Sequence, residues 1–354
     1  MFSEWQWQVL TLPPRHFSWR VRGNPLYWAL HERATLAREY DLLVATSMVD
    51  LATLRGLVPS LAAVPSILYF HENQFSYPRD RQRHSLLEAQ MVSLYGALAA
   101  DRVAFNSAFN RDSFLAGCGD LLDRLPDRVP PGVTALLAEK SRVIPVPVQV
   151  PARTSKRPNS GWPGVGEDTP GRPLRLLWVG RFEHDKGGDR LLAVLRLLER
   201  GGLSFELALV GQQFRDSPSA FGQIAAEFRH RLVQCGYLQS PAEYHAILCA
   251  ADLVLSTTLH EFQGIAVMEA VANGCLPVVP DRLAYPEIYP SRHRYQSDMI
   301  DPAREARSAA SLIGDLWEST LAGQVHPPDV SAFTRDALRG AYCELFGTSG
   351  VASG

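Results

Sequence analysis

Short apolar runs alternate with longer segments of helical spacing along most of the chain. In the first half, apolar runs that end in polar loops predict strands: WQVLTL (7–12), DLLVATS (41–47), PSILYFH (65–71), DRVAFNS (101–107) and SRVIPVPV (141–148). Residues 24–40 and 84–100 carry apolar side chains at the spacing of a helix. This alternation is typical of parallel β-α-β units.

The alternation stops at residues 151–173, a segment rich in Pro, Gly, Ser and Thr that we interpret as an interdomain linker or a disordered insertion. It then resumes. Apolar runs predict strands at 174–180, 205–211, 252–258 and 276–280, and helical patterns occupy 189–202, 241–251 and 264–274, the last closed by Gly274.

The pattern therefore predicts an α/β protein with two domains of comparable size. We place the N-terminal domain at 1–150 and the C-terminal domain at 174–346, with a last helix inside 330–346 and a tail at 347–354. The length of 354 residues also favours two domains over one.

Composition narrows the class of protein. Basic and acidic side chains nearly balance, at 35 against 37, so no overall field recruits nucleic acid and such a partner would need a local basic patch. The five cysteines show no CxxC spacing, which argues against a disulfide framework and a zinc site. Without an apolar run of about 20 residues or a signal-peptide pattern, we expect a cytoplasmic protein with no membrane partner.

Two cations follow the first strand of the C-terminal domain. Gly180 ends that strand, and Arg181 and Lys186 follow it where ligands bind in parallel sheets. Gly187 and Gly188 follow, and their lack of a side chain lets the backbone turn closely into a helix, whose N-terminus attracts phosphate. These residues could neutralise a diphosphate, or they could form an ordinary solvated loop.

Two glutamates flank a glycine turn in HEFQGIAVMEA (260–270). Gly264 lies between strand end and helix start, where its missing side chain would admit a phosphate. Glu261 precedes the helix and Glu269 lies within it, and a carboxylate can accept two hydrogen bonds from a vicinal diol. Alternatively, Glu261 is a first-turn residue favoured by the helix dipole and Glu269 is solvated.

Polar residues also follow the strands of the N-terminal domain. His71, Glu72, Asn73 and Gln74 could contact hydroxyl groups, with Phe75 and Tyr77 as stacking surfaces, or they could cap nearby backbone. Asn106 and Ser107 end a later strand, and we expect Ser107 to be the N-cap of the next helix.

Basic residues gather in two places that could hold RNA phosphates or form solvated faces. One group is Arg15, His16, Arg20 and Arg22, interleaved with Phe17 and Trp19; the other is Arg79, Arg81, Arg83 and His84.

The order Arg181, Lys186, Glu261 and Glu269 resembles the donor site of retaining glycosyltransferases with the GT-B architecture. That resemblance implies two facing Rossmann-like domains with an interdomain cleft. It implies that Arg181 and Lys186 hold the leaving diphosphate, that Glu261 touches the donor sugar and that Glu269 binds the ribose. Gly180, Phe262 and the Gly264–Ile265 backbone complete the implied donor site. The sequence has no Asp-x-Asp beside this motif, so we expect no metal cofactor.

Longer stretches are similar to the tRNA-queuosine α-mannosyltransferase family: LTLPPRHFSWRVRG, YFHENQFSYP, FNSAFNRDSFL and residues 236–290. The resemblance implies transfer of mannose from GDP-mannose to queuosine in a tRNA anticodon. It implies that His71 orients the donor sugar or acceptor and that Asn73 and Gln74 contact the acceptor. The alternatives are a glycosyltransferase with a polysaccharide, lipid or small-molecule acceptor, and a nucleotide-sugar-binding protein without catalysis.

One departure concerns the start of the chain. Family members begin with a strand and a Gly-Ser-His loop, whereas this sequence opens at what would be the second strand. The first strand of a doubly wound sheet is central, so its absence would leave backbone groups unpaired. We interpret the sequence as starting too late, with a truncated, inactive form as the alternative.

Overall fold

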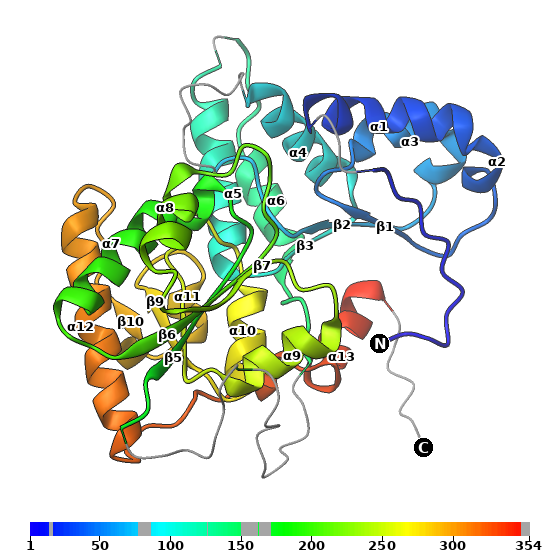
Figure 1. Cartoon of the computed structure of the whole chain (residues 1–354). Helices are drawn as coiled ribbons and strands as arrows, with labels where there is room; N and C mark the ends of the chain where they lie inside the picture. Colours follow the sequence, from blue (N-terminus) through cyan, green and yellow to red (C-terminus); the bar gives the residue numbers. More distant parts are fainter. Residues whose placement is uncertain (14–16, 77–85, 126, 150–161, 163–170, 348–354) are drawn as a thin grey trace. The chain divides into compact units, whose positions relative to one another are not determined.

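The computed structural model describes residues 1–13, 17–76, 86–125, 127–149, 162 and 171–347 (Figure 1). The chain forms two compact units, one of residues 1–146 with the segment from 335 onward, the other of residues 147–334. Each unit contains one parallel sheet with helices, which confirms the predicted α/β class.

The first unit contains a four-stranded parallel sheet in the order β1-β2-β3-β4. Its strands are β1 (Leu43–Thr46), β2 (Ser66–Phe70), β3 (Arg102–Phe105) and β4 (Ser141–Val143). All of β2 is buried because each face of the sheet is covered, so its sequence is a continuous apolar run.

Alternate residues of β2 pack into two different cores. Leu68 and Phe70 belong to the core that also contains buried residues of α4 (Leu87–Ala99) and α5 (Ala108–Leu122). This unit also contains α1 (Phe17–His31), α2 (Arg33–Leu36), α3 (Leu51–Leu57), η1 (Pro59–Ala62) and α6 (Val133–Glu139).

The last helix, α13 (Arg335–Phe346), covers the opposite face of this first sheet. Ile67, Tyr69 and Ile144 pack with Leu345, and the Tyr342 hydroxyl donates to the carbonyl of Pro145 at 3.1 Å. We expected this helix in the C-terminal domain, which it follows directly in the chain. Its apolar side chains instead complete the first unit.

The strand predicted at residues 7–12 is wrong. This segment is coil, Trp7 and Val9 are exposed, and only Leu10 and Leu12 pack partly against a small core. Among the residues that the structure describes, no strand lies beside it to pair with, and an unpaired segment gains nothing from extended backbone.

The second unit contains a six-stranded parallel sheet in the order β10-β9-β8-β5-β6-β7. Its strands are β5 (Leu174–Val179), β6 (Phe205–Val210), β7 (Leu232–Gly236), β8 (Leu253–Leu255), β9 (Leu276–Pro280) and β10 (Arg294–Tyr295). The four predicted strands became β5, β6, β8 and β9. The edge strands β7 and β10 were not predicted.

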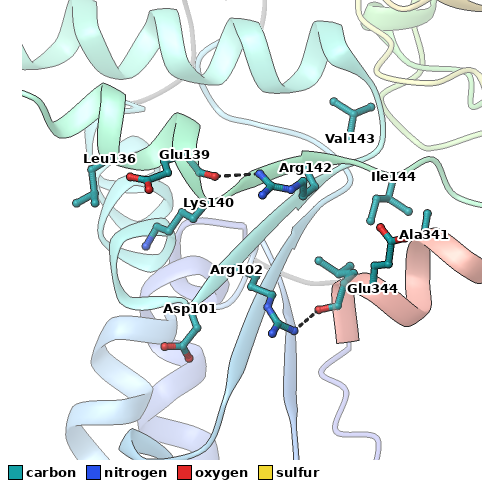
Figure 2. A pocket seen from close by; sticks show the side chains of 11 residues that line it. Asp101, Arg102, Leu136, Glu139, Lys140, Arg142, Val143, Ile144, Ala341 and Glu344 are labelled. Carbon is teal, nitrogen blue, oxygen red and sulfur yellow. Dashed lines mark hydrogen bonds between the residues drawn. The ribbon is translucent and has the colours of Figure 1, made fainter. Parts of the chain in front are cut away.

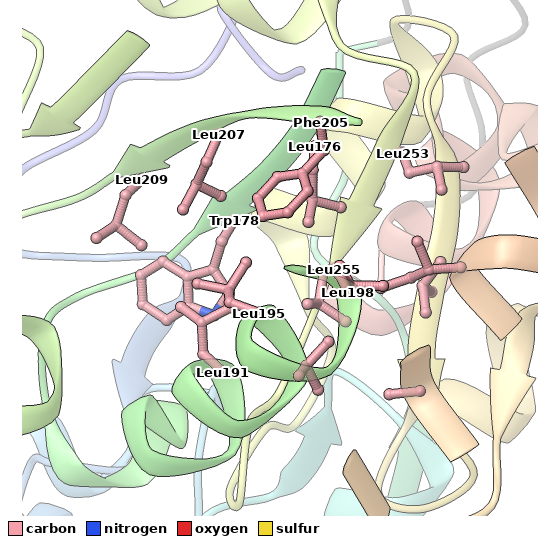
Figure 3. Close-up of a cluster of buried hydrophobic side chains, with 14 of the residues drawn as sticks. Leu176, Trp178, Leu191, Leu195, Leu198, Phe205, Leu207, Leu209, Leu253 and Leu255 are labelled. Carbon is pink, nitrogen blue, oxygen red and sulfur yellow. The ribbon is translucent and has the colours of Figure 1, made fainter. Parts of the chain in front are cut away.

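Helices cover both faces of this sheet. On one face, Leu176 and Trp178 of β5 pack against Leu191 and Leu195 of α7 (Gly188–Arg200), as Figure 3 shows. The same core includes residues of α8 (Ser219–Glu227) and α12 (Pro302–Leu321).

On the other face, Leu177 packs with α9 (Pro241–Ala250) and α10 (Ile265–Ala272). The described part of this unit also contains four shorter helical segments: η2 (His184–Lys186), α11 (Tyr285–Ile288), η3 (Ser291–His293) and η4 (Ser331–Phe333). Gly274 ends α10 with a φ of 105°, as predicted.

Candidate functional site

The strand order of the second sheet reverses between β5 and β8, and the loops that leave these two strands are bound to each other. The chain runs from β5 toward β6 and β7, then crosses to β8. Such a reversal opens a crevice at the carboxyl ends of the two strands, where α/β proteins bind ligands. The loop after β5 (180–187) and the loop after β8 (256–264) lie at this place.

Hydrogen bonds fix one loop on the other. The Thr258 hydroxyl and the Leu259 backbone N–H both donate to the carbonyl of Asp185, at 3.0 and 2.7 Å. The Thr257 hydroxyl donates to the carbonyl of Lys186 at 3.0 Å. Residues more than 70 positions apart in the sequence therefore form one rigid surface.

Two glycines make this surface possible. Gly187 has a φ of 69° and precedes α7, and Gly264 has a φ of 75° and precedes α10. A Cβ atom at Gly264 would lie 2.8 Å from the ring of Tyr285. Both positions therefore require glycine for conformation and for space. The two helices begin at this surface and direct backbone N–H groups toward it.

Lys186 and Glu261 form an ion pair between the two loops. The Lys186 ammonium lies 3.1 Å from the Glu261 carboxylate and 3.4 Å from that of Asp185, and it donates to the His260 carbonyl. Burial alone would raise the pKa of Glu261, but Lys186 and the backbone N–H groups of Gly264 and Gln263 lower it. Both partners are therefore charged at neutral pH.

Arg181 differs from Lys186 in its exposure. Its side chain is 56% exposed, and its guanidinium lies 3.1 Å from the Glu183 carboxylate. Gly180 donates its N–H to the carbonyl of Val210, which keeps the loop in line with β6. The structure thus brings one anchored cation and one exposed cation to the same loop.

Glu269 projects from α10, and its carboxylate accepts a hydrogen bond of 2.9 Å from the Tyr244 hydroxyl of α9. Ile265 begins α10 and is partly buried. Phe262, which we expected at the ligand, is buried with its ring 4.5 Å from that of His260. In this structure the ring of Phe262 packs edge-on against that of His260.

Two residues of this site escaped the sequence analysis. His260 is buried, and burial together with the positive charge of Lys186 lowers its pKa to about 4, so its ring is neutral at pH 7. Tyr244 reaches Glu269 from a different helix. His260 stands directly before Glu261 in the sequence, and this position could have indicated that it belongs to the site. Nothing in the sequence links Tyr244 to Glu269.

Asn73 of the first unit holds its own loop together. Its amide nitrogen lies 2.9–3.0 Å from oxygen atoms of Asn110 and Ser113, and its amide oxygen accepts from the N–H groups of Phe75 and Ser76. These contacts use the whole capacity of the side chain, which is fully buried. In this structure the side chain thus does what the alternative interpretation described, since it caps nearby backbone N–H groups.

The neighbours of Asn73 are placed differently. Gln74 is buried, which leaves little of it for an acceptor, while His71 is exposed with its ring 4.7 Å from that of Tyr69. Asn106 donates to the carbonyl of His71 and accepts from Asn110. Tyr77 lies outside the described residues.

Ser107 is the N-cap of α5, as predicted, because its hydroxyl accepts from the N–H of Asn110. Of the predicted basic groups, Arg20 donates to the carbonyl of Leu12 and Arg22 pairs with Asp50. Arg15, His16, Arg79, Arg81, Arg83 and His84 lie outside the described residues, as does the linker at 151–173 apart from Trp162 and residues 171–173.

A pocket of about 720 Å³ lies elsewhere in the first unit, beside β4 and the end of α13 (Figure 2). It contains none of the predicted residues. Two of its basic side chains donate hydrogen bonds to backbone carbonyls: Lys140 to those of Leu98 and Ala100, and Arg102 to that of Leu345. No helix in the described part of the chain is long and apolar enough to span a membrane.

Comparison with known proteins identifies the chain as a glycosyltransferase. Residues 173–318 match the family model of glycosyl transferases group 1, and residues 1–148 match that of the tRNA-queuosine alpha-mannosyltransferase N-terminal domain. The chain is 34% identical over 292 residues to the tRNA-queuosine alpha-mannosyltransferase of Drosophila melanogaster, covering 82% of this chain and 76% of that relative. It belongs to the tRNA-queuosine α-mannosyltransferase family.

Solved structures confirm the GT-B fold class. The Anabaena protein HepE, in complex with UDP and glucose, superposes with a TM-score of 0.61 at 16% identity, over 90% of this chain and 80% of that one. Sucrose-phosphate synthase from Thermosynechococcus elongatus superposes with a TM-score of 0.57 at 18% identity, over 97% of this chain and 82% of that one.

Proposed function

We propose that this protein transfers mannose from GDP-mannose to queuosine in a tRNA anticodon, with retention of configuration at the anomeric carbon. The observation that carries the proposal is the Lys186–Glu261 ion pair at the switch point of the second sheet, 3.1 Å long and bounded by two helix N-termini. The family of the chain supports the sugar and the acceptor.

The leaving diphosphate would bind against Lys186 and Arg181. Negative charge grows on the phosphate oxygen as the glycosidic bond breaks, and fixed positive charge stabilises it. Lys186 is suited to this because Glu261 and Asp185 hold its ammonium in place before the donor arrives. Arg181 is exposed and can close on the outer phosphate oxygens. The N-terminus of α7 adds partial positive charge.

Glu261 would contact the donor sugar and Glu269 the ribose. The charged form of Glu261 accepts hydrogen bonds from sugar hydroxyls, and a negative charge nearby favours an oxocarbenium-like anomeric carbon. The acceptor hydroxyl would attack from the face that the diphosphate leaves, and the leaving phosphate oxygen would take its proton. This scheme assigns charge neutralisation to side chains and needs no metal ion.

The test is incubation of the protein with GDP-mannose and tRNA that contains queuosine, followed by mass spectrometry of the nucleosides. We expect a hexose added to queuosine, and no product with tRNA that carries guanosine at that position. Release of GDP without a modified nucleoside would point to another acceptor. Binding of GDP-mannose without turnover on any acceptor would contradict an enzymatic role.

A further inference from the structure

Tyr244 and Glu269 form a hydrogen bond between two helices. The phenol oxygen lies 2.9 Å from the Glu269 carboxylate. Helices α9 and α10 pack on the same face of the second sheet, where Ile247 and Leu248 of α9 share a core with residues of α10. The backbone that carries Tyr244 is therefore fixed, and so is the position from which it donates.

The phenol keeps its proton at neutral pH. Burial raises the pKa of Tyr244, and the negative charge of Glu269 raises it further. Tyr244 is thus a permanent donor and Glu269 the acceptor. A side chain that is already bound loses less freedom when a ligand binds to it.

Glu269 has spare capacity for hydrogen bonds. Glu261 forms an ion pair with Lys186, whereas none of the ion pairs among the described residues involves Glu269. An ionised carboxylate offers about four acceptor positions, and Tyr244 uses one of them. Because Tyr244 is a neutral partner that occupies one acceptor position, the other positions of the carboxylate are left for another donor.

We infer that Tyr244 is a positioning residue that holds the Glu269 carboxylate for the ribose diol of the donor, and that it thereby determines selectivity for ribonucleotides. This inference rests on the proposed role of Glu269. A site built to bind a hydroxyl rejects an analogue without it only when its own polar group is fixed and cannot turn to water. Tyr244 supplies that restraint.

The experiment compares the binding of GDP and 2′,3′-dideoxy-GDP by calorimetry, without acceptor. The ratio of the two dissociation constants measures recognition of the diol. We expect Tyr244→Phe to lower this ratio about three- to tenfold, the usual net effect of one hydrogen bond. Glu269→Ala should bring the ratio close to one.

The matched control is Tyr289→Phe. Tyr289 lies in the same apolar core as α10, and its buried hydroxyl has no hydrogen-bond partner among the described residues. We expect it to leave the ratio unchanged. Thermal unfolding of all three variants shows that they are folded under the binding conditions.

The outcomes separate the two hypotheses. An unchanged ratio in Tyr244→Phe, with a reduced ratio in Glu269→Ala, overturns the role of Tyr244 and leaves the donor site intact. An unchanged ratio in Glu269→Ala overturns the ribose assignment itself, and the inference with it.

Discussion

Gly187 lies directly against the backbone carbonyl of Thr257: a Cβ atom at this glycine would be 2.0 Å from the carbonyl oxygen. The contact joins the loop after β5 to the loop after β8, at the point where the strand order reverses. Because Gly187 also has a φ of 69°, both the conformation and the space at this position exclude a side chain.

Replacement of Gly187 by alanine should separate the two loops. The positive φ alone costs about 1–2 kcal/mol, and the clash with Thr257 adds to it. We expect a lower unfolding midpoint and loss of GDP binding. Gly202→Ala is the control, because Gly202 has a φ of 73° with open space around it. If the two variants behave alike, the contact with Thr257 is unimportant.

Replacement of Lys186 by methionine should leave Glu261 without its cation. We expect a destabilisation of about 1–3 kcal/mol and a turnover lower by a factor of about 10² to 10³. Lys186→Met combined with Glu261→Gln should recover part of the stability and none of the turnover, as measured by urea unfolding and the transfer assay.

The exposed pair Arg196–Glu227 provides the control for this ion pair. Arg196→Met should leave the unfolding midpoint and the turnover unchanged. If the double variant is as unstable as Lys186→Met alone, the unpaired charge of Glu261 is not the cause of the instability.

His260 should make stability depend on pH. Its pKa is lowered to about 4 by burial and by Lys186, against an opposing effect of Asp185 and Glu261, whereas the unfolded chain protonates it near 6.5. The unfolded state then binds more protons between these values, so stability falls as pH falls. From pH 7 to pH 5, this loss should reach about 2 kcal/mol.

The measurement is urea unfolding at pH 7 and pH 5. His260→Gln should lose less stability between the two pH values than the parent protein. The stability of this variant should still depend on pH to some extent, because burial also lowers the pKa of His293 to about 4. An equal loss in both proteins would mean that His260 takes up a proton as readily in the folded chain as in the unfolded chain.

Asn73 and His71 should respond differently to alanine. Asn73→Ala removes a fully buried amide and should lower stability by about 1–3 kcal/mol through the partners it leaves unpaired. His71→Ala should keep the unfolding midpoint and lower transfer, if His71 has the orienting role that the family resemblance implies. A stable Asn73→Ala variant that cannot transfer would restore its predicted role at the acceptor.

The loops of the second unit were predictable because their signals are local. Apolar runs defined β5 and β8, and Gly264 and Gly274 marked the bounds of α10. Long-range pairing was not predictable. The edge strand β7 is only partly buried and reads LVQCG, without the apolar run of a central strand.

Sequence alone also could not assign the partners of polar side chains. Asn73 follows a strand, as a ligand-binding residue would, but its hydrogen bonds to Asn110 and Ser113 depend on how α5 packs. The Tyr244–Glu269 contact depends in the same way on the packing of α9 against α10. Residue type and spacing define which bonds are feasible, and tertiary packing selects among them.

The place of α13 has a consequence for synthesis on the ribosome. The second unit is complete at residue 334, but the first unit takes its last helix from residues 335–346. While residues 147–334 are translated, the face of the first sheet that contains Ile67 and Tyr69 lacks its covering helix. The nascent chain therefore carries an exposed apolar surface, open to chaperones, throughout the translation of its second half.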